Sequence, residues 1–153
     1  NSCLNTKIIK IEKINDVKGY GVIARDIISA NTVLGIYAGN FVEDRKAVDS
    51  AYVFGFHGHG KKLDRKWVVD GEKFGNFTGC INSVDPDSSQ SANVQAITVY
   101  LKDHPRVILY AAGDIQVDEE LLLDYGPQYW DELQKRADVA YGSSASGGGG
   151  GAG

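Results

Sequence analysis

Hydrophobic and polar residues alternate over short stretches in the first half of the chain, as they do in half-buried β-strands. Residues 8–14 mix apolar and polar side chains in rough alternation, and residues 22–24 and 33–37 are short, mainly apolar runs. Glycine, asparagine and serine, which favour turns, punctuate residues 18–21 and 29–32. This pattern predicts short strands joined by tight turns.

The middle of the chain predicts another pair of strands. Residues 52–56 and 66–70 carry β-branched and aromatic side chains, and the turn sequence Gly58-His59-Gly60 lies between them. Residues 45–50 form the early segment whose polarity resembles that of a helix. We therefore expect a short helix followed by two paired strands.

The pattern changes in the second half. Residues 77–81 are apolar enough to be buried, and residues 85–93 form a polar loop rich in serine and aspartate. β-branched and aromatic residues fill positions 94–101 and 106–111 on either side of a turn at residues 103–105, which indicates a hairpin.

The last elements complete a mainly β scaffold. Residues 113–120 predict turns, residues 121–125 another strand, and residues 129–137 a short amphipathic helix. The whole pattern predicts many short strands with one or two short helices.

The length of the chain predicts a single domain. Its 153 residues suffice for one domain with a real core and are too few for two ordinary ones. Residues 142–153 consist of glycine, serine and alanine and cannot bury apolar surface. We therefore expect residues 1–141 to form the domain and residues 142–153 to be a flexible linker or an engineered tail.

Charge and apolar content narrow the class of protein. With 42% hydrophobic and 24% charged residues, the composition is that of a soluble globular protein. The net charge of −4 argues against binding nucleic acid through its phosphates and suits a basic peptide partner. No apolar run is long enough for a transmembrane helix, and no signal peptide is visible.

Cysteine and histidine residues indicate neither a metal site nor a clear disulfide. Cys3 and Cys80 could form one bridge, but a free terminal thiol and a small buried side chain are the favoured interpretation. The histidines at positions 57, 59 and 104 are too scattered for zinc-ligand spacing.

Three features concentrate glycine, asparagine and tyrosine beyond the needs of a simple β scaffold. Lys18-Gly19-Tyr20-Gly21 would let the backbone approach a ligand closely, although most such turns are only turns. Asn82 and Asn93 suit a zwitterion or an adenine edge, but asparagine is also an ordinary turn residue. Tyr125 follows an apolar stretch, so its phenol lies either at a cavity edge or in the core with a satisfied hydroxyl.

Taken in order, these features resemble a SET domain over roughly residues 8–130. Lys18-Gly19-Tyr20-Gly21-Val22 resembles the family's Gly-x-Gly turn, and Tyr37-Ala38-Gly39 resembles its Tyr-x-Gly motif. Glu119-Glu120-Leu121 and Asp124-Tyr125-Gly126 are similar to its closing motifs. The resemblance implies a SET-type fold of several small sheets.

The sequence departs from the family in its asparagine motif. Asn82-Ser83-Val84 stands where the family has Asn-His-Ser-Cys-x-Pro-Asn, and a longer loop leads to Asn93. Ser83 occupies the histidine position, which makes the chain more similar to the related PR domains in this segment. No cysteine follows Cys80 in this sequence, so the zinc-binding segment that follows many SET domains is absent from it.

The resemblance implies a protein-lysine N-methyltransferase that uses S-adenosyl-L-methionine and no metal. Tyr125 and Tyr37 would be the catalytic residues, with Tyr125 holding the amine in line with the transferring methyl. The implied cofactor-binding residues are Lys18, Gly19, Tyr20, Gly21, Asn82, Ser83, Tyr125 and Trp130. The implied lining of the lysine channel is Tyr52, Phe54, Leu123 and Tyr129.

The expected partner is a protein or peptide that carries the target lysine, and histone tails are the family's commonest target. Neither nucleic acid nor membrane is expected as a direct partner, and a nuclear location follows only if the substrate is chromatin. Leu123 has no hydroxyl to tether a water near the amine, which predicts that more than one methyl can be added.

Two other hypotheses stay open at the level of sequence. One is a SET-like peptide-binding module with weak or no turnover, motivated by Ser83 and the lengthened loop. The other is an unrelated small β domain with chance motifs. The joint presence of Tyr37, Asn82 and Tyr125 favours the enzyme, because peptide binding alone does not require all of them.

Overall fold

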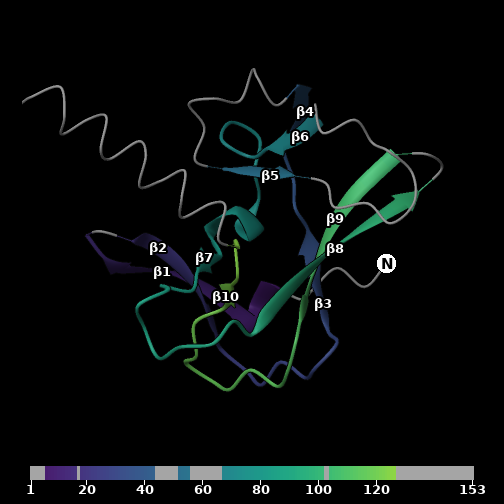
Figure 1. Ribbon diagram of the computed structural model, residues 1–153. Coiled ribbons are helices and arrows are strands. Elements are labelled where there is room, and N and C mark those ends of the chain that lie inside the picture. Colours follow the sequence, from purple (N-terminus) through teal and green to yellow (C-terminus); the bar gives the residue numbers. More distant parts are fainter. Residues whose placement is uncertain (1–5, 17, 44–51, 56–66, 102–103, 127–153) are drawn as a thin grey trace, which may run out of the picture.

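The computed structural model describes residues 6–16, 18–43, 52–55, 67–101 and 104–126. Within these residues the chain forms small sheets of two, five and three strands (Figure 1). The mainly β scaffold expected from the sequence is therefore confirmed. The predicted helices at 45–50 and 129–137 and the Gly58-His59-Gly60 turn lie outside the described residues.

The first sheet is an antiparallel hairpin that follows a single 3₁₀ turn, η1 (Thr6–Ile8). Strand β1 (Ile9–Asn15) pairs with β2 (Gly19–Ala24), and the register places Ile9 opposite Ala24. Gly19 closes the turn at φ +70°, a left-handed conformation that favours glycine. The sequence placed residues 19–21 in the turn, whereas they begin the second strand because their backbone continues the ladder with β1.

The five-stranded sheet has the order β3-β9-β8-β10-β7. Its elements are β3 (Val33–Ile36), β7 (Asn82–Ser83), β8 (Val94–Leu101), β9 (His104–Ala111) and β10 (Leu122–Leu123). The β8–β9 hairpin is confirmed. Its antiparallel ladder runs from the pair Val94 and Ala111 to the pair Leu101 and His104 beside the turn. Strand β10 is parallel to both of its neighbours, β7 and β8, and is shorter than the strand expected at 121–125.

The three-stranded sheet has the order β4-β6-β5. Strands β5 (Val53–Gly55) and β6 (Trp67–Asp70) pair as expected, whereas β4 (Asn40–Glu43) was not predicted. Phe41 of β4 stacks on Trp67 of β6 with ring centroids 4.9 Å apart and an interplanar angle of 4°. This cross-strand stacking is a tertiary contact, which explains why the local sequence around residue 41 did not reveal a strand.

A short 3₁₀ helix, η3 (Phe77–Cys80), follows β6 of the three-stranded sheet and precedes β7 of the five-stranded sheet along the chain. Its N-cap is Asn76, whose Oδ1 accepts a hydrogen bond from the Thr78 amide at 3.2 Å. Thr78 within this helix and Ile81 just after it are buried, which confirms the expectation that residues 77–81 pack inside the protein.

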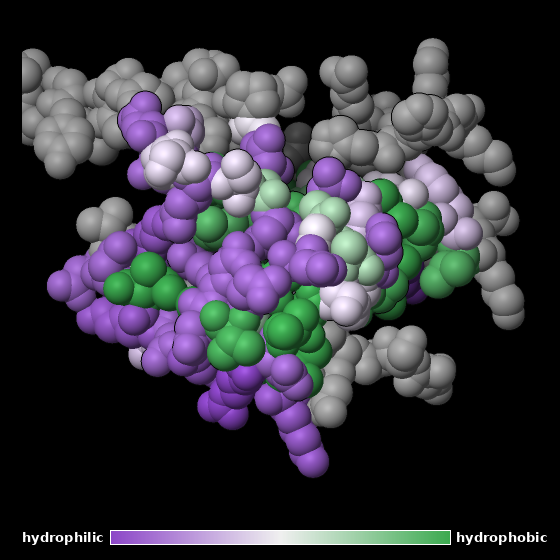
Figure 2. Space-filling model, turned by 90° about the horizontal axis from the view of Figure 1, so that it is seen from below, coloured by the Kyte–Doolittle hydropathy of each residue, from purple (hydrophilic) through white to green (hydrophobic). Residues whose placement is uncertain are grey.

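The core contains residues of all three sheets, including Val69 of β6, and Phe77 and Cys80 of η3 pack against it. Its fully buried large apolar side chains come from β2, β3, β8, β9 and the segments before β3, β7 and β10: Val22, Ile28, Leu34, Ile81, Val94, Val107, Leu109, Ile115 and Leu121. The opposite face of the β3-β9-β8 region exposes apolar side chains, among them Val33, Ile36, Ile97 and Leu101. In Figure 2 hydrophobic residues gather on the side of the β8–β9 hairpin, and the side of the β1–β2 hairpin is mainly hydrophilic.

The segment before β10 connects the first sheet to the second. The Leu121 amide donates to the carbonyl of Val22 at 2.8 Å, and the Ala24 amide donates to the carbonyl of Glu119 at 2.9 Å. The strand then continues into β10 between β7 and β8. One chain segment therefore bonds β2 on one side and the five-stranded sheet on the other.

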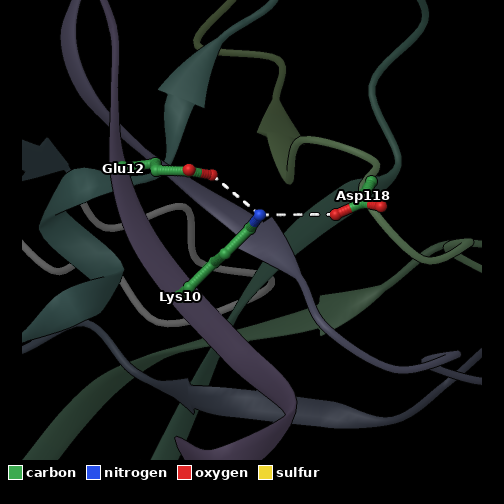
Figure 3. A network of polar contacts seen from close by, with 3 residues as sticks. All are labelled: Lys10, Glu12 and Asp118. Atoms are coloured by element: carbon green, nitrogen blue, oxygen red, sulfur yellow. Dashed lines mark hydrogen bonds and ion pairs between the residues drawn. The ribbon is translucent and has the colours of Figure 1, made fainter.

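A surface ion network adds a second connection between the same parts. Lys10 Nζ of β1 lies 2.9 Å from Glu12 Oε2 and 3.3 Å from Asp118 Oδ1 (Figure 3). Hydrogen bonds to Glu12 and then to Asp118 raise the pKa of Lys10. Because the network is exposed, solvent screens it, and we assign it little weight in holding the fold.

Asn93 clamps the segment that enters β10. Its Nδ2 donates to the carbonyl of Glu120 at 2.8 Å and to Glu119 Oε1 at 3.2 Å, and its Oδ1 accepts from the Leu122 amide at 2.8 Å. Its own amide donates to the carbonyl of Leu122 at 3.0 Å. The side chain that the sequence offered as a candidate ligand group is thus engaged in joining two backbone segments.

Replacing Asn93 with alanine is expected to lower the free energy of unfolding by about 2 kcal/mol, because three side-chain hydrogen bonds are lost together. Urea denaturation measures this change. Ser91→Ala, at an exposed position of the same loop, is the control and should leave the unfolding midpoint unchanged. Equal midpoints for both variants would contradict the clamp.

Candidate functional site

Both the phenol and the backbone amide of Tyr125 form hydrogen bonds with the segment that contains β7. Its phenol donates a hydrogen bond to the carbonyl of Ile81 at 2.7 Å, and its amide donates to Ser83 Oγ at 3.4 Å. The side chain is half-buried and packs against the core. The parallel pairing of β10 with β7 brings these residues together across more than forty positions of sequence.

Ser83 is buried and its hydroxyl is bonded to the backbone. The hydroxyl donates to the carbonyl of Val84 at 3.2 Å while it accepts from the Tyr125 amide. The residue that replaces the family's histidine therefore contacts the main chain on both sides. This geometry indicates that Ser83 supports the position of Tyr125.

Asn82 lies beside the glycine turn of the first sheet. Its Nδ2 donates to the carbonyl of Tyr20 at 3.2 Å and to Glu120 Oε1 at 2.9 Å. The side chain is half-buried. Three segments that are distant in sequence, β2, β7 and the entry to β10, therefore meet at one amide group.

Gly21 makes this meeting possible because it has no side chain. A Cβ at this position would lie 2.6 Å from Glu120 Oε1, 2.7 Å from Ile14 Cγ1 and 3.0 Å from Asn82 Nδ2. The second glycine of the turn is thus required by close packing rather than by its dihedral angles. At Gly19, in contrast, a Cβ would have no atom within 4 Å, so that part of the turn is open.

The aromatic residues expected along the lysine channel form a second group. Tyr37 and Phe54 lie with ring centroids 5.2 Å apart, and the Tyr37 phenol donates to the carbonyl of Tyr52 at 2.8 Å. Burial, and then the negative charge of Asp70, raise the pKa of Tyr37 well above its ordinary value. Tyr37 is therefore a neutral hydrogen-bond donor at physiological pH.

The 3₁₀ helix η3 lies between the two groups. A Cβ at Gly79 would be 3.9 Å from the Tyr52 ring, and the interaction of Cys80 with Tyr37 contributes to the raised pKa of that phenol. The residue that follows η3, Ile81, accepts the hydrogen bond of Tyr125. The structure therefore brings both members of the predicted catalytic pair to the C-terminal end of one short element, Tyr37 beside Cys80 and Tyr125 at Ile81.

The remaining expected site residues differ in how they are placed. The Lys18 amide donates to Asn15 Oδ1 at 2.7 Å within the hairpin turn, and Tyr20 is 62% exposed beside Asn82. Leu123 is buried in the core, opposite Ser83 in the ladder between β10 and β7. Tyr129 and Trp130 lie outside the described residues.

Two residues of this region were not among the expected site residues. The Glu120 carboxylate accepts a hydrogen bond from Asn82 and occupies the space that a side chain at Gly21 would need. Cys80 lies close enough to Tyr37 to affect the pKa of its phenol. Glu120 belongs to a recognised motif, but sequence alone did not reveal which of the two adjacent glutamates faces inward. Cys80 carries a free thiol, which agrees with the favoured interpretation of that residue.

Other classes of site find no support in the described part of the chain. No group of histidine, cysteine, aspartate or glutamate residues there has the arrangement of a metal site. Within the same residues, no helix has the length and apolar character required to span a bilayer.

Comparison with known proteins identifies the family. The SET domain family matches residues 19–126, most of the chain. The match includes the glycine turn, Asn82 and Tyr125. The chain belongs to the SET-domain family.

Several curated relatives are named as histone methyltransferases. The chain is 28% identical over 120 residues to a histone-lysine N-methyltransferase, H3 lysine-4 specific, of Aspergillus oryzae, covering 71% of this chain and 9% of the relative. It is 27% identical over 131 residues to histone-lysine N-methyltransferase set1 of Dictyostelium discoideum, covering 78% and 8%. Histone-lysine N-methyltransferase EHMT1 of Mus musculus is 27% identical over 138 residues, with coverages of 82% and 10%. The chain thus spans about a tenth of the length of the curated relatives that it matches.

A solved structure agrees with the fold. A structure of ctPRC2 in an autoinhibited conformation bound to S-adenosylmethionine superimposes with a TM-score of 0.65 at 22% sequence identity. The likeness covers 84% of this chain and 16% of that chain. It confirms the SET-type arrangement of small sheets.

Gly21→Ala should destabilise the protein by about 1–3 kcal/mol, because the added methyl overlaps Glu120 and Ile14. Thermal denaturation followed by circular dichroism measures the loss. Gly55→Ala is the matched control, since a Cβ there would meet nothing within 4 Å and the position needs no left-handed conformation. If both substitutions leave the same melting temperature, the close packing at Gly21 is refuted.

Proposed function

We propose that the chain is an S-adenosylmethionine-dependent protein-lysine N-methyltransferase. The observation that carries the proposal is the position of Tyr125, bonded to Ile81 and Ser83 beside Asn82 in a SET-domain chain. The names of the curated relatives support the same activity.

The chemistry of the Asn82 region suits the amino-acid part of the cofactor. That part carries an ammonium group, which requires hydrogen-bond acceptors. The Asn82 amide oxygen has no partner among the described residues, and the carboxylate of Glu120 lies on the other side of the same amide. The open space at Gly19 and the exposed ring of Tyr20 adjoin these groups. The residues present therefore fit S-adenosylmethionine.

When bound, the cofactor supplies a methyl group on a sulfonium centre. The protein must present an uncharged lysine amine in line with that methyl and exclude water. A lysine ammonium has an ordinary pKa of about 10.4, so its proton has to leave before attack. A buried aromatic surface disfavours the charged form of the amine by desolvation. Tyr37 and Phe54 supply such a surface.

Tyr125 would position the amine through its phenol oxygen. A phenol that donates its proton to a carbonyl still offers lone pairs as acceptors. The bond from Tyr125 to the carbonyl of Ile81 therefore orients the oxygen to accept an N–H of the substrate. Tyr37 would contribute as a neutral phenol whose own proton is committed to the carbonyl of Tyr52.

The substrate we propose is a histone tail or another basic peptide. The net charge of −4 favours a basic partner, and the curated relatives are named as histone methyltransferases. A nuclear location would follow from a chromatin substrate. We further propose that the catalytic domain lies within residues 1–141; residues 142–153 lie outside the described residues.

A second candidate function is a peptide-binding module with weak or no turnover. It is favoured by one observation, the replacement of the family's histidine by Ser83, whose hydroxyl is occupied by the backbone. The two functions differ in methyl transfer, which makes the choice between them measurable.

Tyr125→Phe is expected to lower the transfer of labelled methyl to a histone peptide by about a hundredfold, because the amine loses its positioning contact. Calorimetric affinity for S-adenosylmethionine should fall much less than the transfer, because Asn82 and Glu120 are unchanged. Tyr110→Phe serves as the control, since it removes a phenol hydroxyl that bonds Gln95 of β8 and is not one of the proposed site residues. A wild-type protein that binds the peptide but transfers no methyl to a broad substrate panel would favour the binding module.

The number of methyl groups added gives a further test of the site. Leu123, two residues before Tyr125, offers no hydroxyl to retain a water, so we expect more than one methyl to be added to the lysine. Mass spectrometry over a full time course measures the products, and Leu123→Tyr should shift them towards monomethyl-lysine. A wild-type reaction that stops at monomethyl-lysine would refute the expectation.

A further inference from the structure

The Asn82 amide faces two groups that can only accept hydrogen bonds. The carbonyl of Tyr20 lies 3.2 Å and the carboxylate oxygen of Glu120 lies 2.9 Å from its Nδ2. A backbone carbonyl and a carboxylate carry no proton to donate. Both hydrogens of the amide therefore have acceptors on this side.

The nature of these acceptors determines the orientation of the amide. The reversed orientation would place the Asn82 oxygen against two other oxygens, with no hydrogen between them. Because hydrogen bonds to charged groups are stronger than neutral ones, the carboxylate of Glu120 contributes more to this preference than the carbonyl of Tyr20.

The opposite side of the amide is available to a ligand. The Asn82 Oδ1 has no partner among the described residues. Within those residues every buried polar side-chain atom has a hydrogen-bond partner, so this oxygen is open to solvent. It lies on the side of the amide away from Glu120.

We infer that Glu120 is a positioning residue that holds the Asn82 amide with its oxygen presented to the ammonium group of the cofactor's amino-acid part; this rests on the proposed function. Without the carboxylate, the amide can rotate and present its nitrogen, which repels an ammonium. Glu120 thereby determines cofactor affinity through Asn82.

Glu120 is itself held in place by the backbone. Its carbonyl accepts from Asn93 Nδ2 at 2.8 Å, and the residue forms an isolated bridge with Ile23 of β2. The missing side chain at Gly21 provides the space that the carboxylate occupies. A contact built on paired backbone segments keeps its geometry before the ligand arrives.

The adjacent glutamate provides a matched control. Glu119 is exposed, and its carboxylate accepts from Asn93 Nδ2 at 3.2 Å and from the Gln116 amide at 2.8 Å. Its carboxylate does not bond the Asn82 amide, yet Glu119→Gln removes the same charge one position away. Any general effect of net charge on the cofactor should appear equally in both variants.

Glu120→Gln is expected to raise the dissociation constant of S-adenosylmethionine roughly three- to tenfold, as for one weakened charge-assisted hydrogen bond. Isothermal calorimetry measures it. The rate of transfer at saturating cofactor should stay near that of the wild type, because Tyr125 and its partners are unchanged. Glu119→Gln should leave the dissociation constant unchanged, and equal constants for the wild type and Glu120→Gln would overturn the inference.

A second measurement needs neither cofactor nor turnover. In the free protein, the side-chain amide signals of Asn82, identified by their loss in Asn82→Asp, should show slow hydrogen exchange in nitrogen-15 spectra. Glu120→Gln should shift the signal of the hydrogen that faced the carboxylate and speed its exchange, and Glu119→Gln should not. Unchanged signals in Glu120→Gln would refute the contact.

A paired exchange of side chains separates positioning from simple loss of charge. Asn82→Asp alone sets two carboxylates against each other, whereas Asn82→Asp with Glu120→Gln lets the new amide donate to the new carboxylate. The double variant should bind the cofactor more tightly than Asn82→Asp alone, and additive losses would count against the inference. A wild type that fails to bind S-adenosylmethionine would reject the proposed function, while the amide signals would still report on the contact itself.

Discussion

The hydrogen bonds between the Asn93 side chain and the segment from Glu119 to Leu122 join the start of β8 to the segment that enters β10. One asparagine amide bonds the backbone on both sides of Leu121. This places Leu121 against β2 and allows β10 to insert in parallel between β7 and β8. A parallel insertion between strands that are not its neighbours in sequence has no hairpin turn to set its register. The amide contacts supply that register.

The functional groups depend on the same insertion. With β10 in place, Tyr125 reaches the carbonyl of Ile81 and Glu120 reaches the amide of Asn82. Both contacts join the closing segment of the SET domain to β7 or to the residue immediately before it. The proposed catalytic phenol and the proposed cofactor-binding amide are therefore positioned by a common structural element. Loss of the Asn93 hydrogen bonds would therefore affect both the phenol of Tyr125 and the amide of Asn82.

Several elements of the fold could be predicted because their signals are local. The β-branched and aromatic residues at 94–101 and 106–111, on either side of a turn, predicted the β8–β9 hairpin, since both strands and their turn are adjacent in sequence. Strand β4 escaped prediction because its stacking partner, Trp67, is distant in the chain. Strand β7 escaped because two residues carry no periodicity. The site residues were proposed by resemblance, and no local pattern distinguished Glu120 from Glu119.

By itself the sequence determined the mainly β class, the positions of several strands along the chain and the family motifs, because composition, periodicity and spacing are properties of neighbouring residues. Tertiary structure alone decided that Asn93 joins two backbone segments while Asn82 keeps an open oxygen. The same residue type serves two purposes because hydrogen-bond partners come from distant segments. It also decided that Gly21 is needed for space, since only the folded chain brings Glu120 and Ile14 against it.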